Sequence, residues 1–256
     1  MAHPSTRVVS RALLVGAFTL AIYYIAAVLR GPQVEAISWN PVHAVVLTVL
    51  GLATGAAWGT RAGLERWRTL EVLLVANLAL VFGLLFLGWT VIWDAAKILE
   101  AVLPGLRDLA YGFWFIAAIL GAYIVRKPGA ALAAETLAAL AEFLAGSQWG
   151  FTLLLSGLVQ GGMAELVFAL TGYRRYDLPT LMAAGAAAGL GSLVVDYLFW
   201  YSDKSLGVLA IMLVSRLLSG AVLAGWLGKT IGDALERAGA LDAFAIARDK
   251  PPTPQA

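Results

Sequence analysis

Long apolar runs, most of them close to twenty residues, recur along the whole chain and limit what it can fold into. Charged residues, glycine or proline separate eight of them, which span roughly residues 11–30, 42–60, 69–93, 110–126, 129–146, 150–171, 179–201 and 206–229. A helix of about 20 apolar residues crosses the hydrocarbon core of a bilayer. Because 61% of the 256 residues are apolar and only 13% are charged, a soluble domain is excluded. We therefore predict an all-α polytopic membrane protein with eight transmembrane helices.

The basic residues predict how these helices are oriented, because cytoplasmic loops are enriched in lysine and arginine. With a cytoplasmic N-terminus, thirteen basic residues fall on the cytoplasmic side and four outside, and Arg216 lies within the last run. This bias predicts that both termini are cytoplasmic. The segment 94–109, on the outside, has the pattern of a short amphipathic helix at the membrane interface. The proline-containing segment 249–256 is expected to be a disordered tail.

Several classes of function are excluded by what the chain lacks. It has no cysteine, and its two histidines, His3 and His43, lie outside or at the edge of apolar runs, so neither a metal site nor a catalytic pair is expected. A net charge of +2 is too small to indicate nucleic-acid binding. Gly228-Lys229-Thr230 resembles the end of a phosphate-binding loop, but Leu223 stands where that loop needs a glycine. We expect no cofactor and no catalysis in this chain.

Ionisable side chains within apolar runs are costly in a membrane and often mark functional sites. Five of them lie inside the runs, away from the ends, namely Glu135, Glu142, Glu165, Asp196 and Arg216. Glu135 and Glu142 are seven residues apart, so they share one helix face, and Glu142 lies about 10 Å nearer the outside. Gln160 lies near mid-depth. We interpret Glu165 and Arg216 as a buried pair that fixes helix packing.

Aromatic residues gather on the same outer side as Glu142 and Asp196. The group consists of Trp89, Trp93, Tyr111, Trp114, Trp149, Tyr197, Trp200 and Tyr201. An interfacial aromatic belt would account for any one of them. Carboxylates, an amide and aromatic faces in one leaflet together favour a pocket that opens outward and binds a flat, nitrogen-rich small molecule that can be cationic.

The most distinctive motifs lie in residues 111–175. They are Tyr111-Gly112-Phe113-Trp114-Phe115, the run Arg126-Lys127-Pro128-Gly129-Ala130-Ala131, and the segment 157–168 with Gln160 and Glu165. These motifs resemble the YkoE-type substrate-binding subunits, or S components, of energy-coupling-factor (ECF) transporters. The resemblance implies a six-helix core at 69–248 with both ends cytoplasmic, preceded by two additional helices in residues 1–68. It also implies that the protein is located in the plasma (inner) membrane of a prokaryotic cell.

The resemblance further implies a subunit that captures thiamine or its precursor hydroxymethylpyrimidine (HMP) from outside. Such a subunit docks on a transmembrane coupling (T) subunit, which two ABC-type ATPases drive with ATP. On this reading Glu142, Gln160 and Asp196 hydrogen-bond an aminopyrimidine. Four aromatic residues would stack on it or close over it: Trp149, Tyr111, Trp114 and Tyr197. Small residues in the first core helix, here Ala79 and Gly83, would contact the partner.

The sequence is also compatible with a second function, that of a secondary transporter. Glu135, Glu142, Glu165 and Asp196 could carry protons through a stand-alone secondary transporter of a small nitrogen-rich solute. Such transporters are often built from inverted repeats, and the arrangement of two plus six runs shows none.

Overall fold

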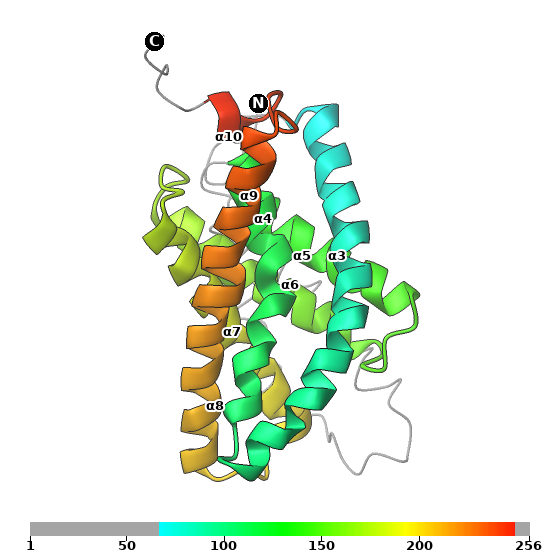
Figure 1. The fold of residues 1–256 in the computed structure, drawn as a ribbon, viewed down its shortest axis with the longest axis vertical. Coiled ribbons are helices and arrows are strands. Elements are labelled where there is room, and N and C mark those ends of the chain that lie inside the picture. Colours follow the sequence, from blue (N-terminus) through cyan, green and yellow to red (C-terminus); the bar gives the residue numbers. More distant parts are fainter. Residues whose placement is uncertain (1–66, 249–256) are drawn as a thin grey trace, which may run out of the picture.

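The computed structural model describes residues 67–248, which form a bundle of helices (Figure 1). In chain order the elements are α3 (Thr69–Ala95), η1 (Ala96–Ala101), η2 (Leu106–Phe115), α4 (Ile116–Val125), α5 (Ala130–Leu144), α6 (Thr152–Leu170), α7 (Leu178–Asp196), η3 (Tyr197–Tyr201), α8 (Leu206–Ser219), η4 (Gly220–Trp226), α9 (Leu227–Arg237) and α10 (Ala245–Arg248). Here η1 and η2 are 3₁₀ helices, whereas η3 and η4 are π-helical. The predicted runs 11–30 and 42–60 and the tail 249–256 lie outside the described residues.

Five continuous helical stretches in the described part are long and apolar enough to cross a membrane. They are Thr69–Ala101, Leu106–Val125, Thr152–Leu170, Leu178–Tyr201 and Leu206–Arg237. The last one extends beyond the predicted end at residue 229. The predicted span 129–146 does contain a helix, α5, but it has only 15 residues. Such a helix is about 22 Å long, which is shorter than the bilayer core of about 30 Å.

The segment 94–109 contains a short helix, η1, as its pattern predicts, but the residues after it enter a different element. Asp94 and Ala95 end α3, and η1 follows directly. The chain then turns at Gly105, which has a φ of +94° and packs against Met212 of α8. From Leu106 onward the segment belongs to η2, and Asp108 is 1% exposed. Asp108 is therefore part of the packed interior, whereas Val102, Leu103 and Leu109 remain exposed.

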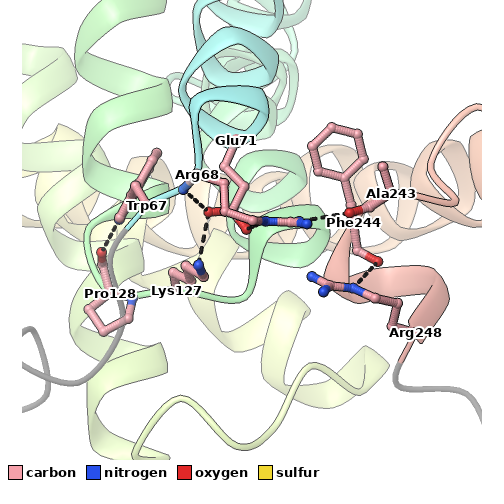
Figure 2. A network of polar contacts seen from close by, with 8 residues as sticks. All are labelled: Trp67, Arg68, Glu71, Lys127, Pro128, Ala243, Phe244 and Arg248. Atoms are coloured by element: carbon pink, nitrogen blue, oxygen red, sulfur yellow. Dashed lines mark hydrogen bonds and ion pairs between the residues drawn. The ribbon is translucent and has the colours of Figure 1, made fainter.

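The described chain begins and ends at the same end of the bundle (Figure 1). Arg68 donates a hydrogen bond of 2.7 Å to the carbonyl of Ala243, and Trp67 donates one of 3.3 Å to Pro128 (Figure 2). Glu71 accepts from the backbone and side chain of Arg68, both at 2.8 Å, and from Lys127 at 2.9 Å. We call this the Arg68 end and the opposite one the Arg107 end. The five long stretches and the shorter α5 together make six passes. An even number of passes returns the chain to the end where it started.

Glu165 holds the turn between α4 and α5 in place. Arg126 ends α4 with a φ of 54°, and Gly129, with a φ of 87°, precedes α5. The Glu165 carboxylate, from α6, accepts the backbone N–H groups of Gly129 at 2.6 Å, Ala131 at 3.0 Å and Leu132 at 3.3 Å. These donors have no partner within their own helix. The predicted pair of Glu165 with Arg216 is therefore wrong, because the carboxylate is used at the start of α5.

Glycine allows α7 to approach the last membrane helix closely. A Cβ atom on Gly185 would lie 2.1 Å from the carbonyl oxygen of Gly220, and one on Gly220 would lie 2.2 Å from that of Gly185. Both helices pass beside each other with backbone in contact, which is how small residues join membrane helices.

We predict that Gly185→Ala lowers the thermal unfolding temperature of the detergent-solubilised chain by about 5 °C or more, because overpacking of this kind typically costs about 1–3 kcal/mol. Gly88→Ala is the matched control, since Gly88 is also within a helix and a methyl group added there would have nothing within 4 Å. Alanine favours helix at both positions. Equal unfolding temperatures for the two variants would contradict the close approach of α7 and η4.

Candidate functional site

A cavity of about 300 Å³ lies toward the Arg107 end, between α3, η2, α5, α6 and the end of α7. Six of the seven predicted ligand-binding residues line it: Tyr111, Trp114, Glu142, Trp149, Gln160 and Asp196. Residues that were not predicted as ligand-binding also line it, including Trp93, Arg107, Glu135, Ser156, Trp200 and Tyr201. The structure thus brings together side chains from helices that are far apart in the sequence.

Tyr197 is the predicted residue that does not line the cavity. Its side chain is 39% exposed, whereas Trp200 and Tyr201 from the same turn are in the lining. The turn Tyr197–Tyr201 is π-helical. A π turn contains more residues than an α turn, so it changes which side chains face inward. The expected aromatic contribution therefore comes from Trp200 and Tyr201.

Glu142 and Glu135 share a helix face, as their spacing predicts, but their hydrogen bonds differ. Glu135 accepts the backbone N–H of Ala118 at 2.9 Å, in agreement with the structural role expected for the deeper carboxylate. Glu142 accepts from the hydroxyl of Ser147 at 3.0 Å through Oε1. Its Oε2 is buried and has no hydrogen-bond partner among the described residues. A buried carboxylate oxygen without a donor is unusual and needs an explanation.

Asp196 is already paired. Its Oδ2 lies 2.8 Å from Nη2 of Arg216, which is fully buried. Arg216 also donates through Nε to Asp108 and through Nη1 to the hydroxyl of Ser192 at 3.1 Å. The guanidinium carbon lies 3.8 Å from the centre of the Tyr111 ring. Arg216 therefore joins η2 to α7 behind one wall of the cavity, and two carboxylates balance its charge.

Three aromatic rings form another wall. Trp93, Tyr111 and Trp114 contact one another edge to face, with ring centres 5.3 to 5.6 Å apart. The indole N–H groups of Trp93 and Trp114 are buried and have no partner among the described residues. Trp89, one turn before Trp93, does have one, because it donates to the carbonyl of Ala110 at 2.8 Å. Two donors and one acceptor on residues of the cavity wall thus lack a partner.

Arg107 is the cation in the cavity lining, and it is held in place. Its guanidinium lies 4.0 Å from the centre of the Trp93 ring, Nε donates to the Trp93 carbonyl at 2.9 Å, and Nη2 pairs with Asp94 at 3.0 Å. Within residues 67–248 no group of three or more metal-ligating side chains lies close enough together to hold an ion.

The predicted contact residues for a partner subunit, Ala79 and Gly83, face inward instead. Both are buried, and a Cβ atom on Gly83 would lie 2.5 Å from the methyl group of Ala141 in α5. Their small size is used for packing α3 on α5, so the assignment of these two residues to partner docking does not fit the structure.

We predict that Arg216→Met lowers the unfolding temperature in detergent by about 10 °C, since removing one member of a buried ion pair costs about 3–5 kcal/mol. Combining it with Asp108→Asn and Asp196→Asn should restore at least half of the loss, because no unpaired charge then remains. Lys204→Met is the control, because it removes an exposed cation at the Arg107 end. A triple variant as unstable as Arg216→Met alone would show that the charge balance is not what matters.

Comparisons with known proteins identify the family of the chain. A family model described as the permease component of an ABC-type cobalt transport system matches residues 70–191. Over 188 residues the chain is 38% identical to YkoE of Bacillus subtilis (strain 168), whose name proposes an HMP/thiamine permease; the alignment covers 73% of this chain and 93% of that protein. A crystal structure of an S-component of an ECF transporter is similar in fold, with a TM-score of 0.67 and 38% identity over 72% of this chain and 93% of the other. The chain belongs to the S-components of ECF transporters and is related to YkoE.

Proposed function

We propose that this S-component captures thiamine or HMP from outside the cell in the cavity beside Glu142 and passes it to a T subunit driven by two ATPases. As an S-component, the chain is a multi-pass membrane protein that serves as a transport subunit and is not an enzyme. It binds substrate without a cofactor, and ATP is used by the ATPase partners. The observation that carries the proposed ligand is the unpartnered Oε2 atom of Glu142.

An aminopyrimidine matches the unsatisfied groups around the cavity. Its amino group donates hydrogen bonds, as Oε2 of Glu142 requires, and its ring nitrogens accept them, as the indole N–H groups of Trp93 and Trp114 require. The flat ring suits the aromatic wall, and the Gln160 amide can both donate and accept. A volume of about 300 Å³ is at the small end of ligand pockets, which suits a small heterocycle.

Charge in the lining favours a neutral or cationic ligand. Glu135, Glu142 and Asp196 contribute three carboxylates, whereas Arg107 contributes one guanidinium, which Asp94 already pairs. Arg216 balances Asp196 and Asp108. The thiazolium ring of thiamine is positively charged, so the carboxylate of Glu142 would stabilise it.

The distribution of basic residues supports an outward-facing cavity. At the Arg68 end lie Arg68, Arg126, Lys127, Arg174, Arg175, Arg237 and Arg248, and at the Arg107 end lie Lys97, Arg107 and Lys204. Because cytoplasmic ends are richer in lysine and arginine, the Arg68 end is cytoplasmic in this proposal. The cavity then lies in the outer half of a prokaryotic plasma membrane. Residues 1–68 would add two spans and keep the N-terminus inside.

The stand-alone proton-coupled transporter has less support. Of the four carboxylates that could carry protons, Glu135 and Glu165 accept backbone N–H groups and Asp196 pairs with Arg216. Each of these contacts holds its carboxylate in one position, which suits a structural role better than a proton relay. Membership of the S-components points to coupling through ATPase partners.

Calorimetric titration of the purified chain with thiamine and with HMP tests this proposal. We expect Glu142→Gln to weaken binding about ten- to a hundred-fold, because a hydrogen bond to a charged group contributes about 1.5–3 kcal/mol. Glu135→Gln is the matched control on the same helix face, and its amide oxygen can still accept from Ala118. Unfolding temperatures would confirm that both variants are folded. An unchanged dissociation constant for Glu142→Gln with a large loss for Glu135→Gln would move the site deeper and overturn the assignment.

A further inference from the structure

A second cavity, of about 840 Å³, lies at the Arg68 end and has a different chemistry from the first. Five cations line it, namely Arg68, Arg126, Lys127, Arg174 and Arg248, together with the single carboxylate of Asp177. Tyr173 and Tyr176 complete much of the wall. These residues come from the starts of α3 and α7, the end of α4, and α10, so the cavity forms only in the folded bundle.

Positive charge exceeds negative charge in this cavity. Glu71 lies beside it and pairs with both Arg68 and Lys127, at 2.8 and 2.9 Å. Asp177 pairs with Arg175 at 3.0 Å, and hydrogen bonds from the side chains of Thr180 and Arg175 hold its pKa below the usual range. Each of the two carboxylates is thus already paired with a cation in or beside the cavity. Arg174 and Arg248 are exposed, and neither forms an ion pair within residues 67–248.

The backbone around the cavity is specifically shaped. Arg126 and Tyr173 have φ angles of 54° and 56°, and they are the two non-glycine residues with positive φ in the described part of the chain. Both line this cavity. Arg126 ends α4 and Tyr173 follows the end of α6, so the left-handed conformation of each turns the chain away from a helix at the cavity. The Arg126 guanidinium is further held against the Tyr123 and Tyr176 rings, at 5.4 and 5.3 Å from their centres.

The cavity also lies at the level where membrane helices end. α3 begins at Thr69, next to Arg68, and α6 ends at Leu170, three residues before Tyr173. The side chains of Leu70 and Leu170 are 52% and 79% exposed. Apolar side chains exposed beside a group of cations match the two parts of a phospholipid, its acyl chains and its phosphate. Basic pockets between membrane helices are known to hold anionic head groups.

We propose that this basic cavity binds the phosphate of an anionic phospholipid head group, with the acyl chains lying along the exposed apolar sides of the neighbouring helices. The phosphate accepts charge-assisted hydrogen bonds from Arg174 and Arg248, with the other lining cations around it. The inference is independent of the proposed vitamin ligand, because it concerns the opposite end of the molecule.

Native mass spectrometry of the full chain, titrated in detergent with phosphatidylglycerol or phosphatidylcholine, tests this site. We expect phosphatidylglycerol to bind at least about ten-fold more tightly. Arg174→Gln combined with Arg248→Gln should weaken its binding about thirty-fold, or roughly five-fold for each cation removed. Lys97→Gln combined with Lys204→Gln removes the same charge from exposed positions at the Arg107 end and should change binding less than two-fold.

Three results would overturn the proposal. Equal binding of the two lipids, or equal weakening by both pairs of substitutions, would show that no specific head-group site exists at the Arg68 end. Complete displacement of phosphatidylglycerol by glycerol 3-phosphate at equal concentration would identify a soluble phosphate compound as the ligand. If the Arg174 and Arg248 variant binds lipid normally but no longer copurifies with the T and ATPase subunits, the cations serve an acidic protein surface.

Discussion

The ion pairs of Arg216 are the interaction on which the arrangement of the cavity depends. A buried guanidinium is unfavourable unless carboxylates and hydrogen-bond acceptors surround it. Here η2 supplies Asp108, and α7 supplies Asp196 and Ser192. Because α8 carries the cation, three elements must come together before its charge is balanced. Tyr111, which packs against the same guanidinium, is thereby placed in the cavity wall.

This arrangement separates the buried carboxylates by role. Asp108 and Asp196 balance Arg216, Glu165 accepts the first N–H groups of α5, and Glu135 accepts an N–H group of α4. Among these five, Glu142 alone has a fully buried oxygen without a hydrogen-bond partner in the described structure. The structural carboxylates make the site rigid, and the remaining one is available for a ligand. Preorganisation of this kind lowers the entropy that binding must overcome.

Sequence reasoning reached the positions that depend on helix spacing and depth. The seven-residue interval placed Glu135 and Glu142 on one face, and depth brought Gln160, Asp196, Tyr111 and Trp149 into one region; the cavity contains all of these. Trp93 was recognised as an outer aromatic residue but could not be distinguished from Trp89, because only the fold shows that the Trp89 indole has a partner.

Other features required knowledge of which helices are neighbours or of local backbone geometry. Counting residues along the runs put Glu165 and Arg216 at similar depth, which suggested a pair. In the structure Glu165 lies at the turn between α4 and α5, at the Arg68 end, whereas Arg216 pairs with Asp108 of η2 and Asp196 of α7. Asp108 was assigned to an interfacial segment, because the pattern does not reveal that the chain after Gly105 enters the bundle. Trp200 and Tyr201 line the cavity in place of Tyr197 because the turn Tyr197–Tyr201 is π-helical. A helical-wheel projection with a constant 100° per residue does not represent such a turn.

An experimental structure of the chain saturated with thiamine would test the central claim most directly. We predict an aminopyrimidine ring in the cavity beside Trp93 and Trp114, with its amino nitrogen about 2.7–3.2 Å from Oε2 of Glu142. Thiamine bound elsewhere, or bound in this cavity with Oε2 of Glu142 still without a donor, would contradict it.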